Sequence, residues 1–365
     1  MARKGATLMS DRKAERQQKV DRIIENLASS AEGREILKES LHRAGIAMMN
    51  VISRETFPVV TDPDRLARAR RGIILDTETT GVDVTSDEII ELGMVEFTYD
   101  QDGILSIGKS FEALNEPLRK RIDAEVEGIT GISNDMVAGH RIDPGEVSEF
   151  IGDASLIIAH HSNFDRKIVE LNLPEVGFDT RPWGCSLDGV DWKARGKNSR
   201  SLEALALSEG YVFGSHRADA DCMATLFVLN SMDSNGKTAF AEMRDSAATK
   251  SLFIIAEKSP FSRKDEIKNR DGYKWSSDGT EAYGHKAWHV EIPDTPEAVA
   301  EEAAFLRDIY GKDVSLPCYH VDYLTRHSAR KPSQKELFRT REVAEIAAAA
   351  DQYETDRRAQ HTFEL

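Results

Sequence analysis

The order of apolar runs in the middle of the chain limits its possible folds more than any other feature. Short runs typical of strands occur at 73–75, 89–97 and 104–111, with Asp and Gly residues separating the second from the third. Three strands in succession predict a meander. Beyond residue 122, helix-like stretches alternate with a buried run at 156–159. This pattern predicts an α/β fold, with a mixed sheet flanked by helices.

The regions on either side differ from this central part and divide the chain into four. Helix-spaced apolar residues before a basic, proline-containing connector predict a helical N-terminal segment. After about residue 235, short strands around an Ala- and Glu-rich helix at 296–310 predict a small α+β unit. Ser333 and Glu336 form a capping box, which predicts a last helix over 333–359. The predicted parts are an N-terminal helical segment and linker (1–70), a central domain (71–234), an α+β accessory domain (235–332), and a C-terminal helix and tail (333–365).

Composition excludes several classes of protein. The 365 residues are 40% hydrophobic and 30% charged, an ordinary globular mixture. No stretch approaches the roughly 18 apolar residues of a membrane-spanning helix, and no apolar run follows the basic N-terminus as in a secretory signal. Cys185, Cys222 and Cys318 form neither a disulfide framework nor a zinc pattern. We therefore expect a reduced, cytoplasmic protein that does not bind membranes.

The central domain is strongly acidic. Residues 71–234 carry 14 Lys and Arg against 30 Asp and Glu. This balance argues against simple electrostatic attraction to a polyanion. Carboxylates that hold divalent cations would explain it, so the spacing of the acidic residues becomes decisive.

The first acidic motif directly follows the apolar run 73–75 and reads Asp76-Thr77-Glu78-Thr79-Thr80-Gly81. Two carboxylates at positions i and i+2 of a strand point to the same face, so Asp76 and Glu78 can meet one cation. For a bare Asp-x-Glu, a strand ending in a polar turn is the simpler explanation. The complete motif is expected by chance in only about one chain in 10⁴ of this length.

Two further acidic motifs follow in order. Asp165 lies in the first turn of the helix expected after 156–159, where it would also complement the helix dipole. The segment from His216 to Asp221 opens another helix, and its spacing lets these two residues face one pocket. An imidazole with a pKa near neutral can take a proton from a water, and a carboxylate can hold the metal that acidifies that water.

In content and order, the three segments DTETTG, AHHSNFD and HRADAD resemble the motifs of the DEDDh 3′→5′ exonucleases. That family includes the proofreading subunit of bacterial replicative DNA polymerase. The segments ITGI at 129–132 and SLEALA at 201–206 add to the resemblance, which covers residues 72–232. The histidine five residues before the last aspartate marks the DEDDh form, because the sister group has a tyrosine where this chain has Arg217. One departure is His161, which stands where the family commonly has asparagine.

The resemblance implies an RNase H-like fold and two divalent cations, Mg²⁺ or Mn²⁺. Asp76 would bridge both ions, Glu78 and Asp221 would complete the site nearest the attacking water, and Asp165 would serve the second ion. His216 would be the general base. The family's contacts to the terminal nucleotide carry over to five residues: Thr77, Thr79, Thr80, Thr130 and Phe164.

The implied activity is the release of 5′-mononucleotides from a 3′ end in DNA repair or proofreading, with single-stranded DNA or a DNA 3′ end as the partner. An exoribonuclease of the RNase T or oligoribonuclease kind is an open alternative, although the extra domains favour DNA. A catalytically inactive nucleic-acid-binding module is another, but it predicts the loss of a ligand residue, and none is lost. A polymerase or clamp partner also stays open, since Gln334–Phe338 only weakly resembles a clamp-binding peptide.

Two basic regions bear on the path of a substrate. One comprises Lys193, Arg195, Lys197 and Arg200, which would either contact backbone phosphates or form a solvated loop. In the other, Trp275 and Trp288 alternate with lysines. These tryptophans would either stack on the bases of a single strand or form the core of a small domain.

Overall fold

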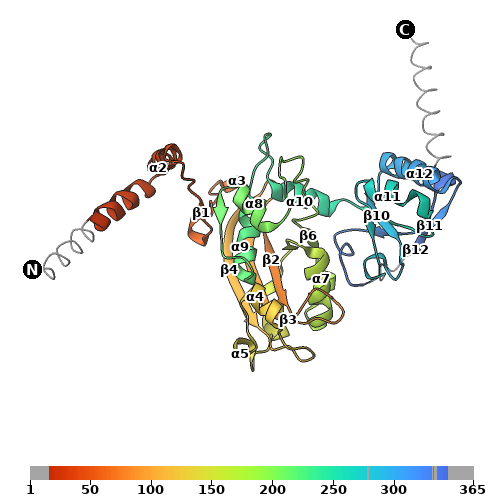
Figure 1. Cartoon of the computed structure of the whole chain (residues 1–365), viewed down its shortest axis with the longest axis horizontal. Helices are drawn as coiled ribbons and strands as arrows, with labels where there is room; N and C mark the ends of the chain where they lie inside the picture. The colour runs from red at the N-terminus through yellow and green to blue at the C-terminus, as the bar shows by residue number, and fades with distance from the viewer. Residues whose placement is uncertain (1–15, 278, 331, 333–334, 344–365) are drawn as a thin grey trace, which may run out of the picture.

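A computed structural model describes residues 16–277, 279–330, 332 and 335–343. Within these residues the chain forms two separate five-stranded sheets, preceded by helices that extend away from the first sheet (Figure 1). The predicted N-terminal helical segment is confirmed by a helix at 16–28 and by α2 (Ala31–Arg43). No helix in this part of the chain is long and apolar enough to cross a membrane.

The first sheet has the strand order β4-β3-β2-β5-β6. Its strands are β2 (Arg70–Thr79), β3 (Ile89–Tyr99), β4 (Ile104–Leu114), β5 (Leu156–Ala159) and β6 (Trp183–Cys185). The first three form the predicted antiparallel meander, and β5 and β6 extend the sheet beside β2 as parallel strands. The predicted mixed sheet is therefore confirmed. The three-residue strand β6 is too short to show a pattern in the sequence.

Helices cover both faces of this sheet, so its central strands are buried on both sides. The helices of the central region are α4 (Ala124–Thr130), α5 (Asn134–Val137), α6 (Pro144–Ile151), α7 (Ser162–Asn172), α8 (Leu202–Ser208), α9 (Ala218–Leu229) and α10 (Ala239–Ala248). Ile74 points to the core beneath α8, α9 and α10, whereas its neighbours Ile73 and Leu75 point to the core beneath α6 and α7.

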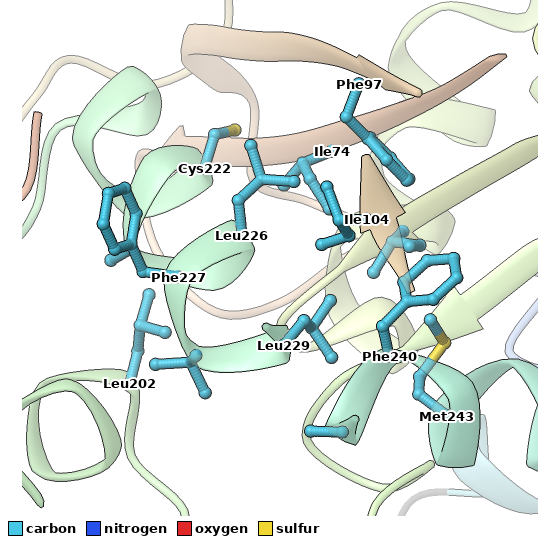
Figure 2. Packing of buried hydrophobic residues seen from close by; sticks show 14 of the residues in the cluster. Ile74, Phe97, Ile104, Leu202, Cys222, Leu226, Phe227, Leu229, Phe240 and Met243 are labelled. Atoms are coloured by element: carbon cyan, nitrogen blue, oxygen red, sulfur yellow. The ribbon is translucent and has the colours of Figure 1, made fainter. Parts of the chain in front are cut away.

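The core of the first sheet extends beyond the boundary predicted at residue 234. Phe240 and Met243 of α10 belong to the same buried cluster as Ile74 and Leu229, and Figure 2 shows them directed toward it. The N-terminal side also contributes, because Phe57 is buried in this cluster. Just before Phe57, β1 (Asn50–Val51) pairs in parallel with β7 (Tyr211–Val212).

The second sheet has the order β12-β11-β8-β10-β9. It is formed by β8 (Ser251–Ala256), β9 (Lys274–Trp275), β10 (Trp288–Pro293), β11 (Ser315–Val321) and β12 (Lys335–Arg339), with α11 (Lys264–Asn269) and α12 (Pro296–Tyr310). The helix predicted at 296–310 and the strands near 274, 288 and 318 are present.

The helix predicted from Ser333 is wrong over β12. Residues 335–339 form a strand paired antiparallel with β11, and Phe338 is buried in the core of the second sheet. A capping box is a local signal, and here pairing with a distant strand overrides it. Ser333 and the predicted helical residues beyond 343 lie outside the described residues.

The two sheets are joined through α7. Arg166 is fully buried, and its guanidinium donates to the backbone carbonyls of Tyr323, Leu324 and Arg326. The backbone N–H of Trp183 in β6 donates to the carbonyl of Tyr323 at 2.9 Å. These buried hydrogen bonds fix the second unit against the helix that also carries Asp165.

Candidate active site

The predicted carboxylates lie at the end of β2, where the strand leaves the core. Asp76 is opposite Gly93 and Glu78 is opposite Glu91 of β3, so both acidic side chains lie on one face of the sheet. Asp221 of α9 lies on the same side. One carboxylate oxygen from each of Asp76, Glu78 and Asp221 falls within 4.8 Å of the others. The structure therefore brings two of the three sequence motifs into a single cluster.

The close approach of α9 to β3 positions Asp221. A Cβ atom at Gly93 would lie 2.5 Å from the carbonyl carbon of Ala218, so only glycine allows the helix to begin this near the strand. Asp221 is 8% exposed, and its Oδ2 accepts from the backbone N–H of Arg217 at 3.1 Å. This contact caps the helix and holds the carboxylate toward β2.

Asp165 is fixed next to the cluster by the first motif itself. It is 3% exposed in the first turn of α7, and its Oδ1 accepts a hydrogen bond of 2.8 Å from the hydroxyl of Thr77. Asp165 also lies near enough to raise the pKa of Asp76 by charge repulsion. Thr77 therefore orients a carboxylate, whereas the sequence predicted that it contacts substrate.

The four carboxyl groups crowd one another in a region shielded from water. Burial raises the pKa of Glu78 to about 8, and repulsion from Asp221 and Glu91 adds to this effect. Burial likewise raises the pKa of Asp165 to about 7 and that of Asp221 to about 6, and it raises the pKa of Asp76 well above its ordinary value. Oxygen ligands of this kind suit a hard divalent cation, which would relieve the repulsion.

His216 lies at the edge of this cluster, in the loop that leads into α9. Its side chain is exposed, and its Nε2 lies 3.8 Å from Oε1 of Glu203. Its backbone has φ 64°, a left-handed conformation that is rare for a residue other than glycine. Such strain persists only where neighbouring contacts fix the chain.

Those contacts come from a buried residue that sequence reasoning missed. Glu91 is fully buried, and its carboxylate accepts hydrogen bonds from the guanidinium of Arg217 and from the backbone N–H of Ala218. Arg217 also contacts Glu112 on β4 at 2.7 Å. The signal in the sequence was a charged residue inside the apolar run 89–97.

The other predicted substrate contacts have different environments. Thr79 is half-buried, and its hydroxyl donates to the carbonyl of Gly81. Phe164 is also half-buried, with its ring stacked near that of His161. Both lie beside the cluster.

The side chains of Thr80 and Thr130 are buried. Thr80 is fully buried, and its hydroxyl donates to Asp87 at 2.9 Å. Thr130 is 6% exposed, and its hydroxyl donates to the carbonyl of Val126. Both hydroxyl groups hold local turns in place.

The predicted basic loop is mostly paired within the protein. Arg195 contacts Glu242 at 2.7 Å, and Lys197 forms an ion pair with Glu209. Arg200 is 3.0 Å from Asp188, which leaves Lys193 as the exposed cation of the loop without an ion pair in the described chain.

The two tryptophans and the clamp-like peptide belong to the second sheet. Trp288 packs against the core of the second sheet, and its ring centroid is 5.5 Å from that of the half-exposed Trp275. Phe338 of the clamp-like segment is 4% exposed in β12. It is therefore not available to a partner in this conformation.

Comparison with known proteins now identifies the class of protein. Residues 73–229 match the RNase_T exonuclease family. The chain belongs to this family, in agreement with the DEDDh motifs, because a curated member is 30% identical over 172 residues and is covered over 74% of its length.

That relative is the DNA polymerase III subunit epsilon of Treponema pallidum, which matches 43% of this chain. The PolC-type DNA polymerase III of Thermotoga petrophila is 31% identical over 213 residues, or 55% of this chain. The match spans only 15% of that polymerase. A solved structure of exonuclease X in complex with 5′-overhanging duplex DNA is 23% identical, with a TM-score of 0.36, over 48% of this chain and 99% of that one. A likeness at this score does not bear on function.

Proposed function

We propose that this protein is a divalent-metal-dependent 3′→5′ exonuclease that acts on DNA. The observation that carries the proposal is the cluster of Asp76, Glu78 and Asp221, whose carboxylate oxygens lie within 4.8 Å of one another. Asp165 lies beside them, and His216 lies in the loop before α9. We propose that these five residues act together, as the DEDDh resemblance implies.

The cluster would hold two cations, Mg²⁺ or Mn²⁺. When bound, these ions would acidify a water molecule and offset the negative charge that develops on the phosphate. Asp76, Glu78 and Asp221 would supply carboxylate oxygens to the cations. Asp165, which the hydroxyl of Thr77 orients, would hold the second cation. The raised pKa values of these carboxyl groups support this role, because burial and mutual repulsion of the carboxylates both favour a bound positive charge.

His216 would accept the proton of the attacking water. The His216 side chain is exposed, and a neutral imidazole accepts a proton through a ring nitrogen. Once protonated, the ring would be stabilised by Glu203, whose carboxylate lies 3.8 Å from Nε2. The contacts of Arg217 with Glu91 would hold the loop so that this ring stays near the substrate.

Four further features of the proposal concern biology and the terminal nucleotide. The relatives named as DNA polymerase III subunits favour DNA over RNA and a role in replication or repair. By the same reasoning we propose a polymerase as a partner, whereas a clamp would have to bind elsewhere than at the buried Phe338. The three buried free cysteines agree with a reducing, cytoplasmic location. Thr79 and Phe164 would contact the terminal nucleotide.

The test uses the full chain and 20-nucleotide single strands of DNA and of matched RNA, with the label at the 5′ end or at the 3′ end. With Mg²⁺ or Mn²⁺, 5′-labelled DNA should shorten one nucleotide at a time, and 3′-labelled DNA should release mononucleotides. Asp76→Asn should abolish this activity. Asp219→Asn is the matched control, because Asp219 lies on the same helix as Asp221 but outside the cluster.

Each result has a defined meaning. Preference for RNA would move the assignment to the exoribonuclease class, in which the 2′-hydroxyl is recognised. Binding of the strand without hydrolysis would favour an inactive binding module. Equal activity in Asp76→Asn and the native chain would refute the proposed site.

A further inference from the structure

A cavity of about 470 Å³ lies between the central domain and the second sheet. One wall is the outer face of α7, which contributes Asn163 and Lys167, one helical turn apart. The opposite wall includes Phe253 of β8 and Tyr283. A cavity of this size falls within the range of roughly 300–1,000 Å³ that is typical of small-molecule sites. It flanks the helix that carries Asp165, and it does not involve the carboxylate cluster.

Lys167 lines this cavity together with Arg326, whose guanidinium is already paired with Glu291. In the described part of the chain its ammonium group forms no hydrogen bond and no ion pair within 4.0 Å, and Glu281 attracts it only from a distance. Lys167 is partly buried in the wall of this cavity. A partly buried cation without a close partner indicates that an anionic group completes the site.

The remaining lining suits a flat heteroaromatic ring. Phe253 and Tyr283 meet edge to face, with ring centroids 5.0 Å apart, and both line the cavity. The carboxylate of Glu281 can accept hydrogen bonds from amino or imino groups. The amide of Asn163 can both donate and accept, so these groups match the edge of a base.

We propose that this cavity binds a nucleoside 5′-monophosphate, with its phosphate at Lys167, its base against Phe253 and Tyr283, and its amino group at Glu281. Phosphate alone would leave the aromatic wall unused, and an apolar ligand would leave Lys167 uncompensated. The choice of a nucleotide rests on the proposed function in one respect, since that activity releases nucleotides on the other side of α7. The nucleotide is either free in solution or one unit of a bound strand, and both have the same chemistry.

The experiment is calorimetric titration of the full chain with dGMP in EDTA, so that binding does not depend on the metal cluster. Deoxyguanosine and ribose 5-phosphate test the two halves of the ligand separately. Lys167→Met removes the ammonium group and keeps an unbranched side chain. Lys193→Met is the matched control, an exposed lysine of the same domain without an ion pair in the described chain.

We expect dGMP to bind at one site, and each half of the ligand to bind at least about tenfold more weakly. Because Lys167→Met removes a charged hydrogen-bond donor, it should weaken binding by about tenfold or more, and Lys193→Met should weaken it by less than about twofold. Glu281→Gln should weaken dGMP without affecting ribose 5-phosphate. Displacement of dGMP by a single-stranded decamer would assign the site to a unit of the strand, and its absence to free nucleotide.

The absence of dGMP binding to the native chain would overturn the proposal. Equal affinity in a folded Lys167→Met variant, checked by its thermal unfolding, would overturn it as well. Hydrolysis in Mg²⁺ is measured in parallel on the native chain. If the chain hydrolyses DNA but binds no dGMP, the proposed function stands and this site is refuted. If it binds dGMP but does not hydrolyse DNA, this site stands and the proposed function is refuted.

Discussion

Replacing Glu78 by glutamine should stabilise the metal-free protein, although it removes a functional group. The pKa of Glu78 is raised to about 8 from an ordinary value of 4.5 by burial and by repulsion from Asp221 and Glu91. Between these two pH values the folded state binds more protons than the unfolded state, so stability is highest below pH 4.5 and falls as the pH rises through 8. Glu78→Gln removes this loss.

The size of the effect follows from the shift. Each pKa unit corresponds to 1.36 kcal/mol, so the shift sets a ceiling of about 5 kcal/mol. Glu78 is half-buried, and screening by solvent reduces this to about 2 kcal/mol. For a domain of this size, about 2 kcal/mol raises the Tm by about 4–8 °C.

The assay is thermal unfolding in EDTA at pH 8 and pH 5, followed by a titration with Mg²⁺ at pH 8. We expect Glu78→Gln to melt higher than the native chain at pH 8 and at nearly the same temperature at pH 5. Mg²⁺ should stabilise the native chain more than the variant. Glu175→Gln, at an exposed position of the same domain, is the control and should change neither Tm. A variant that melts at or below the native temperature at pH 8 would refute the argument from charge repulsion.

Of three further predictions, two concern the supports of the site and the third concerns a buried ion pair at the other end of β3. Glu91→Gln should lower kcat by about 10–100-fold with little change in Tm or KM, because it loosens the loop that holds His216; an unchanged kcat would contradict this positioning role. Gly93→Ala should destabilise the protein by about 1–3 kcal/mol in urea unfolding, since its Cβ would press on α9; an unaltered midpoint would exclude that clash. A hydrogen bond from Arg65 lowers the pKa of buried Asp100 to about 2. Asp100→Asn should therefore lower the free energy of unfolding by about 2 kcal/mol above pH 4. In urea unfolding, this difference from the native chain should shrink as the pH falls from 4 toward 2.

The carboxylate cluster was predictable because its signals are local. Asp76 and Glu78 share a face by strand geometry alone, and Asp221 lies in the first turn of the helix that begins after His216 and Arg217. The order of apolar runs likewise predicted the meander and the mixed sheet. Such features depend on neighbours within a few residues, which the sequence displays directly.

The supports of the cluster depend on distant neighbours and were not predictable. Glu91 and Arg217 meet from positions 126 residues apart. The hydroxyl groups of Thr77 and Thr80 are used inside the protein because of where Asp165 and Asp87 lie after folding. The strand β12 forms for the same reason, since only the exposed edge of β11 makes it preferable to a helix.

Arg166 makes the stability of the first unit depend on the second. This side chain follows Asp165 directly, and three of its hydrogen-bond acceptors are backbone carbonyls at residues 323, 324 and 326. A shortened chain that ended after α10 would keep all the acidic motifs and the ion pair of Arg166 with Glu170, but it would lose these three carbonyl acceptors. A hydrogen bond to a charged group contributes about 1.5–3 kcal/mol. The first sheet is therefore expected to be less stable when it is expressed without the second.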